Sequence, residues 1–180
     1  MYFDKYECPF LSHNDYGYRN DNMNVPARKA VAHIAGGPLD PNIRGTAVFT
    51  QVPGGTEVSV EVNGLPTYRP AMDGNPQIGP HGFHIHQNGT CAVGDSAEPF
   101  SSAGEHWNPT NQPHGNHAGD FPVLFSNNGY SRITFFTNKF NVAQIIGKSV
   151  IIHESPDDYR TQPSGASGRR LACGVIRVVM

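Results

Sequence analysis

Two histidines, His84 and His86, lie two residues apart in the otherwise apolar segment Gly82-Phe83-His84-Ile85-His86. Side chains alternate between the two faces of a strand, so a strand here would point both imidazoles to the same side. Such a pair can form half of a metal site. Taken alone it is weak evidence, because a His-x-His pair in a β protein is more often incidental than metal-binding.

Further residues with ligand chemistry follow along the chain. His114, His117 and Asp120 recur every third residue in a loop that is compact enough to bend three side chains around one ion. Three histidines and one carboxylate suit zinc, which takes four nitrogen or oxygen ligands, whereas an imidazole-rich site without a carboxylate suits copper. The complete candidate set is His84, His86, His106, His114, His117, Asp120 and His153.

Composition indicates which kind of protein must position these residues. A chain of 180 residues is long enough for one domain with its own core. Its 20 glycines, 15 prolines and only 16% charged residues are typical of short strands and many turns. The net charge of -2 argues against a general nucleic-acid or acidic-membrane binder.

The ends and the apolar runs bear on location. No apolar run approaches the ~20 residues that span a bilayer. Residues 1–24 lack the basic and apolar regions of a secretory signal, so no signal peptide is expected in the given chain. We predict an N-terminal arm over residues 1–27, mobile or loosely docked, and a domain over residues 28–180.

Hydrophobic patterning predicts an all-β domain of about eight short strands. Val58, Val60 and Val62 alternate with polar residues, as in a half-buried antiparallel strand. Asn128-Gly129 between two apolar runs predicts a hairpin. The expected strands are 29–34, 43–52, 58–63, 82–86, 122–126, 130–137, 146–153 and 171–179. This spacing favours an antiparallel sandwich or barrel whose long loops carry the site.

The segment between Leu65 and His81 is too rich in proline for a strand or a helix. It is also long for a connection in a compact sandwich. It could bind a partner or border the site, and a tolerated surface insertion is an equal alternative.

Five motifs together resemble those of the copper/zinc superoxide dismutase family, in the family's order and over roughly residues 27–179. They are Gly82–His86, Gly104–Pro109, His117–Asp120, Ile146–His153 and Gly168–Val175. The resemblance implies an eight-stranded antiparallel Greek-key sandwich or barrel, immunoglobulin-like, with long metal-binding and electrostatic loops. It also implies an oxidoreductase whose substrate is the superoxide anion and whose products are dioxygen and hydrogen peroxide.

The same resemblance assigns the ligands position by position. Copper, cycling between Cu(2+) and Cu(+), would be held by His84, His86, His106 and His153. Zinc would be held by His106, His114, His117 and Asp120. His106 would therefore bridge both metals, release copper and carry a proton during turnover.

Two residues outside the ligand set match further family positions. Asp157 matches a carboxylate that hydrogen-bonds the counterparts of His84 and His114, although a solvated loop charge beside Asp158 is the alternative. Arg170 matches the arginine at the entrance to copper. Because Arg169 precedes it, the match is ambiguous by one residue, and a plain basic loop is the alternative.

Three cysteines, Cys8, Cys91 and Cys173, cannot all pair within one chain. The family's animal members carry a partner cysteine six residues before His106, where this chain has Phe100. Cys91 instead matches the bacterial arrangement, which implies a disulfide between Cys91 and Cys173 and leaves Cys8 over. A disulfide favours an extracytoplasmic or cell-surface location, in tension with the absence of a signal.

Two departures from the family concern loops. The segment from His114 to His117 is short, which bears on zinc binding, and the loop from His153 to Arg170 carries few charges, which bears on electrostatic steering.

The rival interpretation of the function is a non-enzymatic metal-binding or structural protein, which would be expected to lose a copper ligand. A copper carrier would need an exposed Cys or Met cluster, which the sequence lacks. A homodimer is possible, but no surface of the sequence marks one.

Overall fold

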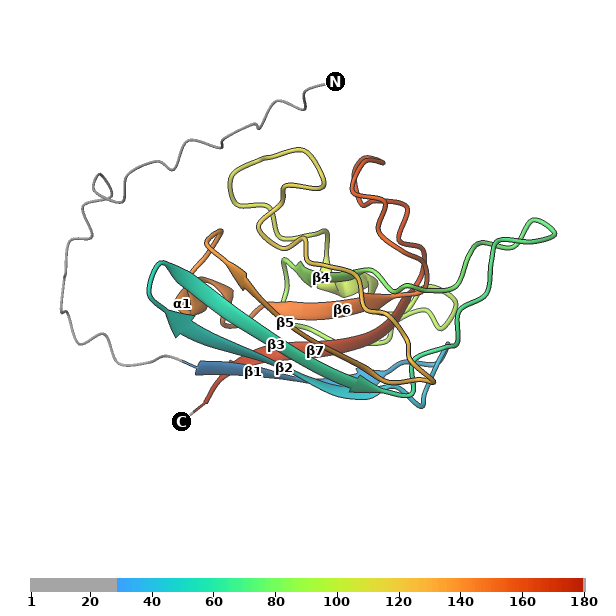
Figure 1. The fold of residues 1–180 in the computed structure, drawn as a ribbon, viewed down its shortest axis with the longest axis horizontal. Coiled ribbons are helices and arrows are strands. Elements are labelled where there is room, and N and C mark those ends of the chain that lie inside the picture. Colours follow the sequence, from blue (N-terminus) through green and yellow to red (C-terminus); the bar gives the residue numbers. More distant parts are fainter. Residues whose placement is uncertain (1–28, 180) are drawn as a thin grey trace, which may run out of the picture.

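The computed structural model describes residues 29–179, which form one curled antiparallel sheet of seven strands (Figure 1). The strand order across the sheet is β4-β6-β7-β1-β2-β3-β5. The elements are β1 (Lys29–Gly36), β2 (Arg44–Val52), β3 (Gly55–Asn63), β4 (Phe83–His86), η1 (Ser101–Ala103), β5 (Ser131–Thr137), α1 (Val142–Ile145), β6 (Ser149–His153) and β7 (Arg170–Val178). The predicted N-terminal arm and Cys8 lie outside the described residues.

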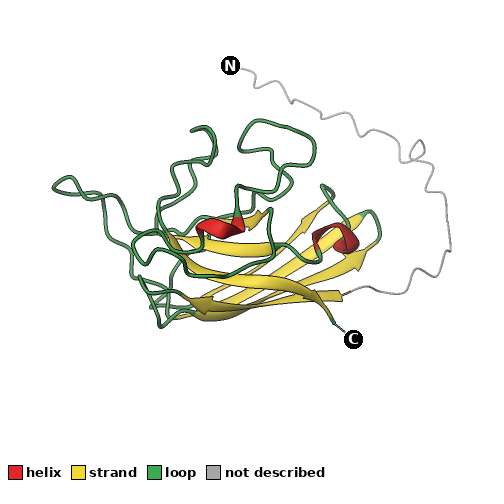
Figure 2. Ribbon diagram, turned by 180° about the vertical axis from the view of Figure 1, so that it is seen from behind, coloured by secondary structure: helices red, strands yellow, loops and turns green. Residues whose placement is uncertain are grey.

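The curl of the sheet encloses the core. In β3 the three alternating valines are buried, while Glu57, Glu61 and Asn63 on the other face are exposed, which confirms the half-buried strand. All residues of β4 and β6 are buried, because the loops cover their other face. Figure 2 shows the strands wrapping in this way, with the short helical turns η1 and α1 beside them. The all-β fold predicted from composition and patterning is confirmed.

The strand count differs from the expected eight, because residues 122–126 do not form a strand. The segment still runs beside β4: the backbones of His81 and Leu124 exchange two hydrogen bonds of 2.8 Å, and Asp120 forms an isolated bridge with His84. Pro122 has no N–H to donate, which prevents a regular ladder. Residues 119–124 thus occupy the place of an eighth strand as an irregular seam.

The predicted hairpin after this seam is present. Asn127 and Tyr130 exchange backbone hydrogen bonds, and Asn128 and Gly129 both have positive φ, as a type I′ turn requires. The strand expected over residues 146–153 begins only at Ser149, because the chain first leaves α1 and turns at Gly147.

Long loops rise from the sheet on the side of β4, while a separate hairpin projects beyond the end of the sheet (Figure 1). Residues 66–80 make this hairpin through the bridges Arg69–Ile78 and Met72–Asn75. Its Tyr68 and Met72 are 58% and 66% exposed. No helix within residues 29–179 has the length and apolar character needed to span a bilayer.

Candidate metal centre

A first group of ligand atoms lies where β4, β6 and one loop meet. His84 and His86 come from β4, His153 is the last residue of β6, and His106 follows η1 and forms a bridge with His86. All four histidines are buried. One ring nitrogen from each lies within 4.8 Å of one from every other. The predicted strand therefore places its imidazoles together, and the loop and β6 supply the remaining two.

The second nitrogen of each ring fixes how the ring is turned. His86 Nδ1 lies 2.9 Å from the Gly104 carbonyl oxygen, and His153 Nδ1 lies 3.2 Å from that of Gly168. Their Nε2 atoms consequently face each other at 3.3 Å. Two acceptors thus orient two rings so that one nitrogen of each points into the group.

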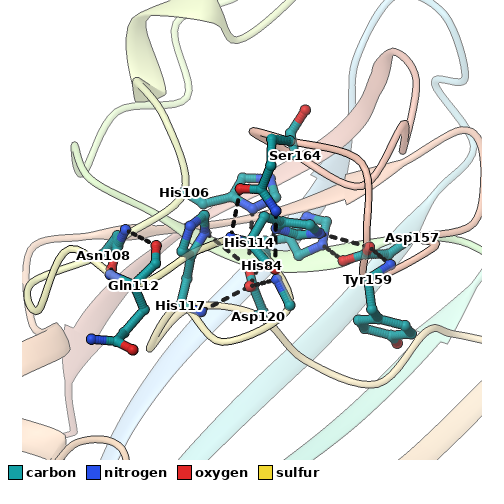
Figure 3. Close-up of polar contacts among 12 residues, drawn as sticks. His84, His106, Asn108, Gln112, His114, His117, Asp120, Asp157, Tyr159 and Ser164 are labelled. Atoms are coloured by element: carbon teal, nitrogen blue, oxygen red, sulfur yellow. Dashed lines mark hydrogen bonds and ion pairs between the residues drawn. The ribbon is translucent and has the colours of Figure 1, made fainter.

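A second group consists of His106, His114, His117 and Asp120, whose ligand atoms also lie within 4.8 Å of one another. Asp120 is central to it (Figure 3). Its carboxylate oxygens lie 3.0 Å from His106 Nδ1, 3.3 Å from His114 Nδ1 and 3.4 Å from His117 Nδ1. The ring of His106 stacks on that of His84 at 3.9 Å between centroids, so His106 belongs to both groups.

Four buried ring nitrogens in these groups have no hydrogen-bond partner within residues 29–179: His84 Nδ1, His106 Nε2, His114 Nδ1 and His117 Nδ1. A buried polar atom left unpaired costs about 1–3 kcal/mol, so such a cluster needs a further partner. Metal ions at the two groups would supply it. Four imidazoles suit copper, and three imidazoles with one carboxylate suit zinc. The residues present therefore fit both metals.

Asp157 connects the two groups by contacting one histidine of each on the ring nitrogen that faces away from the group. Its Oδ2 lies 2.7 Å from His84 Nε2 and its Oδ1 lies 2.8 Å from His114 Nε2. The Tyr159 backbone N–H also donates to Oδ1, over 2.7 Å. Asp157 is only 4% exposed, whereas the neighbouring Asp158 is exposed. Each ring that contacts Asp157 has its free Nδ1 directed into a ligand group.

Burial controls the protonation of three histidines in the first group, His84, His86 and His153. Burial, and after it the charge of His106, lowers the pKa of His153 to about 3. Burial likewise lowers the pKa values of His84 and His86 well below their ordinary value. Neutral imidazole is the form that binds metal, so these residues are prepared as ligands near neutral pH.

Asp120 is held in its charged form by the second group. Burial acts to raise its pKa, but the hydrogen bond with His106 and the charges of His114, His106 and His117 outweigh burial. The net effect lowers the pKa of Asp120. A carboxylate in this state is ready to bind a cation.

The two neighbouring arginines have different surroundings. Arg170 donates from Nη1 to the Phe100 carbonyl over 2.6 Å and from Nη2 to the Gly104 carbonyl over 2.8 Å. The Gly104 carbonyl also contacts His86, so Arg170 lies next to the first group. Arg169 instead forms a two-point ion pair with Glu154.

The Cys91–Cys173 disulfide is present and joins the loop before η1 to β7. Around it, Phe100, Ala103 and Ile151 form a small second core. Phe100 at the end of this loop and Gly104 directly after η1 supply the two carbonyls that hold Arg170. The disulfide therefore fastens the segment that positions this arginine.

Two residues that touch the backbone of the second group were not anticipated from the sequence. Gln162 hydrogen-bonds the backbone of His114, and Lys139 Nζ donates to the His117 carbonyl over 3.0 Å. Neither residue has a distinctive spacing or type. Only the folded arrangement of the loops brings them to the ligands.

Sequence comparison assigns the chain to a class of metalloprotein: residues 43–176 match the family described as copper/zinc superoxide dismutase (SODC), and the chain belongs to this family. The Cu-Zn superoxide dismutase of Deinococcus radiodurans is 37% identical over 154 residues, which cover 76% of this chain and 79% of the relative. That of Legionella pneumophila is 34% identical over 142 residues, covering 74% and 77%. The solved Cu/Zn superoxide dismutase from Brucella abortus superposes with a TM-score of 0.65 at 31% identity, covering 82% of this chain and 98% of the other.

Proposed function

We propose that this protein is an enzyme that dismutes superoxide, converting two superoxide anions and two protons into dioxygen and hydrogen peroxide. The observation that carries the proposal is the convergence of four buried imidazoles on one point. Copper held by His84, His86, His106 and His153 supplies the electron chemistry, because it can accept one electron and return it. Every other task falls to the side chains.

His106 is proposed to hold and deliver a proton. Its Nδ1 is fixed 3.0 Å from Asp120, and its Nε2 is buried without a hydrogen-bond partner in the described structure. Nε2 can therefore carry a proton toward the reduced oxygen, while Nδ1 stays anchored. Solvent supplies the second proton of hydrogen peroxide.

The remaining ligands are proposed to hold His106 in place. With zinc, His114, His117 and Asp120 would keep its Nδ1 fixed as Nε2 gains and loses its proton. Asp157 would orient His84 and His114 together. Arg170 is proposed to attract and orient the superoxide anion, since its charge lies beside the Gly104 carbonyl that also contacts His86.

The alternative function is a metal-binding or structural protein without turnover. Such a protein would be expected to lack a copper ligand, whereas all four histidines occur here and are brought together. Metal analysis and a superoxide assay on one preparation test the proposal. We expect about one copper and one zinc per chain and rapid dismutation; zinc alone, with no activity after copper loading, would refute it.

We further propose that the protein works in an oxidising, extracytoplasmic compartment, since the Cys91–Cys173 disulfide suits such conditions. Thiol labelling after rapid acid quenching of cells should find this pair oxidised.

We also propose that the protein forms a homodimer, in which a second copy covers the exposed apolar residues of the 66–80 hairpin. Sedimentation at several protein concentrations tests it.

A further inference from the structure

We propose that Gln162 is a positioning residue of the zinc site, and that its side chain fixes the backbone of His114 and thereby sets zinc affinity. This inference rests on the proposed function, because it takes His114 as a zinc ligand. It concerns a residue outside both ligand groups and separate from Asp157.

The carboxamide of Gln162 hydrogen-bonds both the backbone N–H and the backbone carbonyl of His114. The His114 backbone N–H donates to Gln162 Oε1 over 2.8 Å, and Gln162 Nε2 donates to the His114 carbonyl over 3.3 Å. The same Nε2 also donates to the Arg160 carbonyl over 3.2 Å, which steadies the carboxamide. Only a side chain with both an acceptor and a donor can make this contact.

His114 depends on such outside contacts because its own segment is irregular. It lies in no helix or strand, and the next residue, Gly115, has a φ of +89°. Its ring is held through Nε2 by Asp157, which comes from the same loop as Gln162. Figure 3 shows the ring of His114 between Asp157 and Asp120. One loop therefore holds the ring and the backbone of His114 at once, and without Gln162 the backbone could shift while the ring stayed tethered.

Gln162 differs from a residue that merely supports the fold. Its own side chain is exposed, whereas His114 is buried. Truncating it removes no core packing, so the metal-free protein should remain folded. Its effect should instead appear in metal binding, where residues that orient ligands typically change affinity by 10- to 100-fold.

The test is zinc affinity of the full chain, measured by chelator competition after metal removal, together with the absorption spectrum of cobalt bound in the zinc site. We expect Gln162→Ala to weaken zinc binding about tenfold or more and to alter the cobalt spectrum. Gln162→Glu keeps an acceptor for the His114 N–H and should restore part of the affinity. Gln112→Ala is the matched control, because the Gln112 side chain contacts Thr110 and Asn116 but no ligand residue.

The outcomes separate this inference from the proposed function. Zinc affinity of Gln162→Ala within about twofold of wild type, or a loss no larger than that of Gln112→Ala, would overturn the inference alone. Gln162→Glu binding zinc no more tightly than Gln162→Ala would overturn the role of the His114 N–H. If Gln162→Ala fails to fold, the zinc affinity of Gln162→Glu decides the question. Weaker zinc binding than wild type would support the inference, and equal binding would overturn it. A wild-type chain that binds no zinc would overturn both the zinc site and the inference.

Discussion

At the scale of single residues, an acceptor orients one nitrogen of an imidazole while the other nitrogen faces a ligand group. Carbonyls orient His86 and His153, and one carboxylate, Asp157, orients His84 and His114. A carboxylate offers an acceptor oxygen to each ring, so neither ring competes with the other. The orienting atoms are therefore as specific as the ligands themselves.

Replacing Asp157 tests this division of roles. In Asp157→Asn one acceptor oxygen becomes an amide donor, so only one of the two rings keeps its contact. We expect metal affinity to fall about 10- to 100-fold, measured by competition for zinc and for copper. The same change at the exposed neighbour, Asp158→Asn, is the control, and equal losses in both variants would contradict the role of Asp157.

The pKa of His153 predicts how the metal-free protein responds to acid. Its pKa is lowered to about 3 in the folded state, so the unfolded state binds the extra proton once pH falls below about 6.5. Stability contributed by this residue is thus full above pH 6.5 and declines as pH falls toward the folded pKa. At pH 5 the loss from His153 alone is about 2 kcal/mol.

Denaturant unfolding of the metal-free protein at pH 7 and pH 5 measures this loss. His153→Gln removes the titrating group, so the difference between the two pH values should shrink by about 2 kcal/mol. An unchanged pH response in His153→Gln would show that the residue is protonated already in the folded protein.

At the scale of elements, the sheet supplies rigid positions and the loops supply the rest. His84 and His86 are fixed by the pairing of β4 with β6, and His153 by the pairing of β6 with β7. The other members of the two groups, His106, His114, His117 and Asp120, belong to irregular segments. The loop ligands need separate restraints, which include the disulfide and the contacts from residues 157–162. Loss of a restraint should therefore affect the loops before the sheet.

Removal of the disulfide tests the largest of these restraints. The pair Cys91→Ser with Cys173→Ser should lower the free energy of unfolding by about 2–5 kcal/mol, because the unfolded chain gains freedom. Denaturant unfolding in a Cys8→Ser background, which prevents exchange with the third thiol, measures the change. Mild reduction of the otherwise native protein should produce the same loss, and a loss under about 0.5 kcal/mol would contradict the expectation.

Much of the sheet, and the seven residues that the structure brings together in the two groups, could be predicted from the sequence. Alternating valines fixed the exposed and buried faces of β3, and the Asn128-Gly129 turn located the hairpin before β5. The disulfide followed from the resemblance to the bacterial arrangement. Residues 119–124 could not be predicted to pair irregularly, because that outcome depends on where Pro122 falls against β4. The contact of Gln162 with His114 also escaped prediction, since it joins two loops distant in sequence.

At the scale of the whole molecule, the net charge is small, so the location of individual charged groups matters more than their sum. The net charge of -2 gives no general attraction for an anion, so attraction must come from a local positive group. Arg169 is paired with Glu154, whereas Arg170 donates to the carbonyl oxygens of Phe100 and Gly104. Within residues 29–179 Arg170 forms no ion pair, although the charges of Glu105 and Glu98 act on it, and it lies beside the first ligand group.

Salt dependence of the reaction measures that attraction. Arg170→Ala should lower kcat/KM for superoxide about tenfold or more and flatten its decrease with ionic strength. Arg170→Lys should keep most of the salt dependence, because it keeps the charge. Arg169→Ala serves as the control with a smaller effect. Unchanged rates and salt response in Arg170→Ala would remove this residue from substrate capture.

The irregular seam along β4, residues 119–124, has a consequence for local opening of the folded protein. Residues 119–124 lie along β4 with a few isolated backbone contacts, and Asp120, the proposed zinc ligand, lies within them. A cation held there would tie the weakest edge of the barrel to the two neighbouring loops. Loss of zinc should therefore allow residues 119–124 to separate locally from β4. In the zinc-free protein the amides of Leu124 and Ile85 should then exchange with deuterium well before those of β1 to β3.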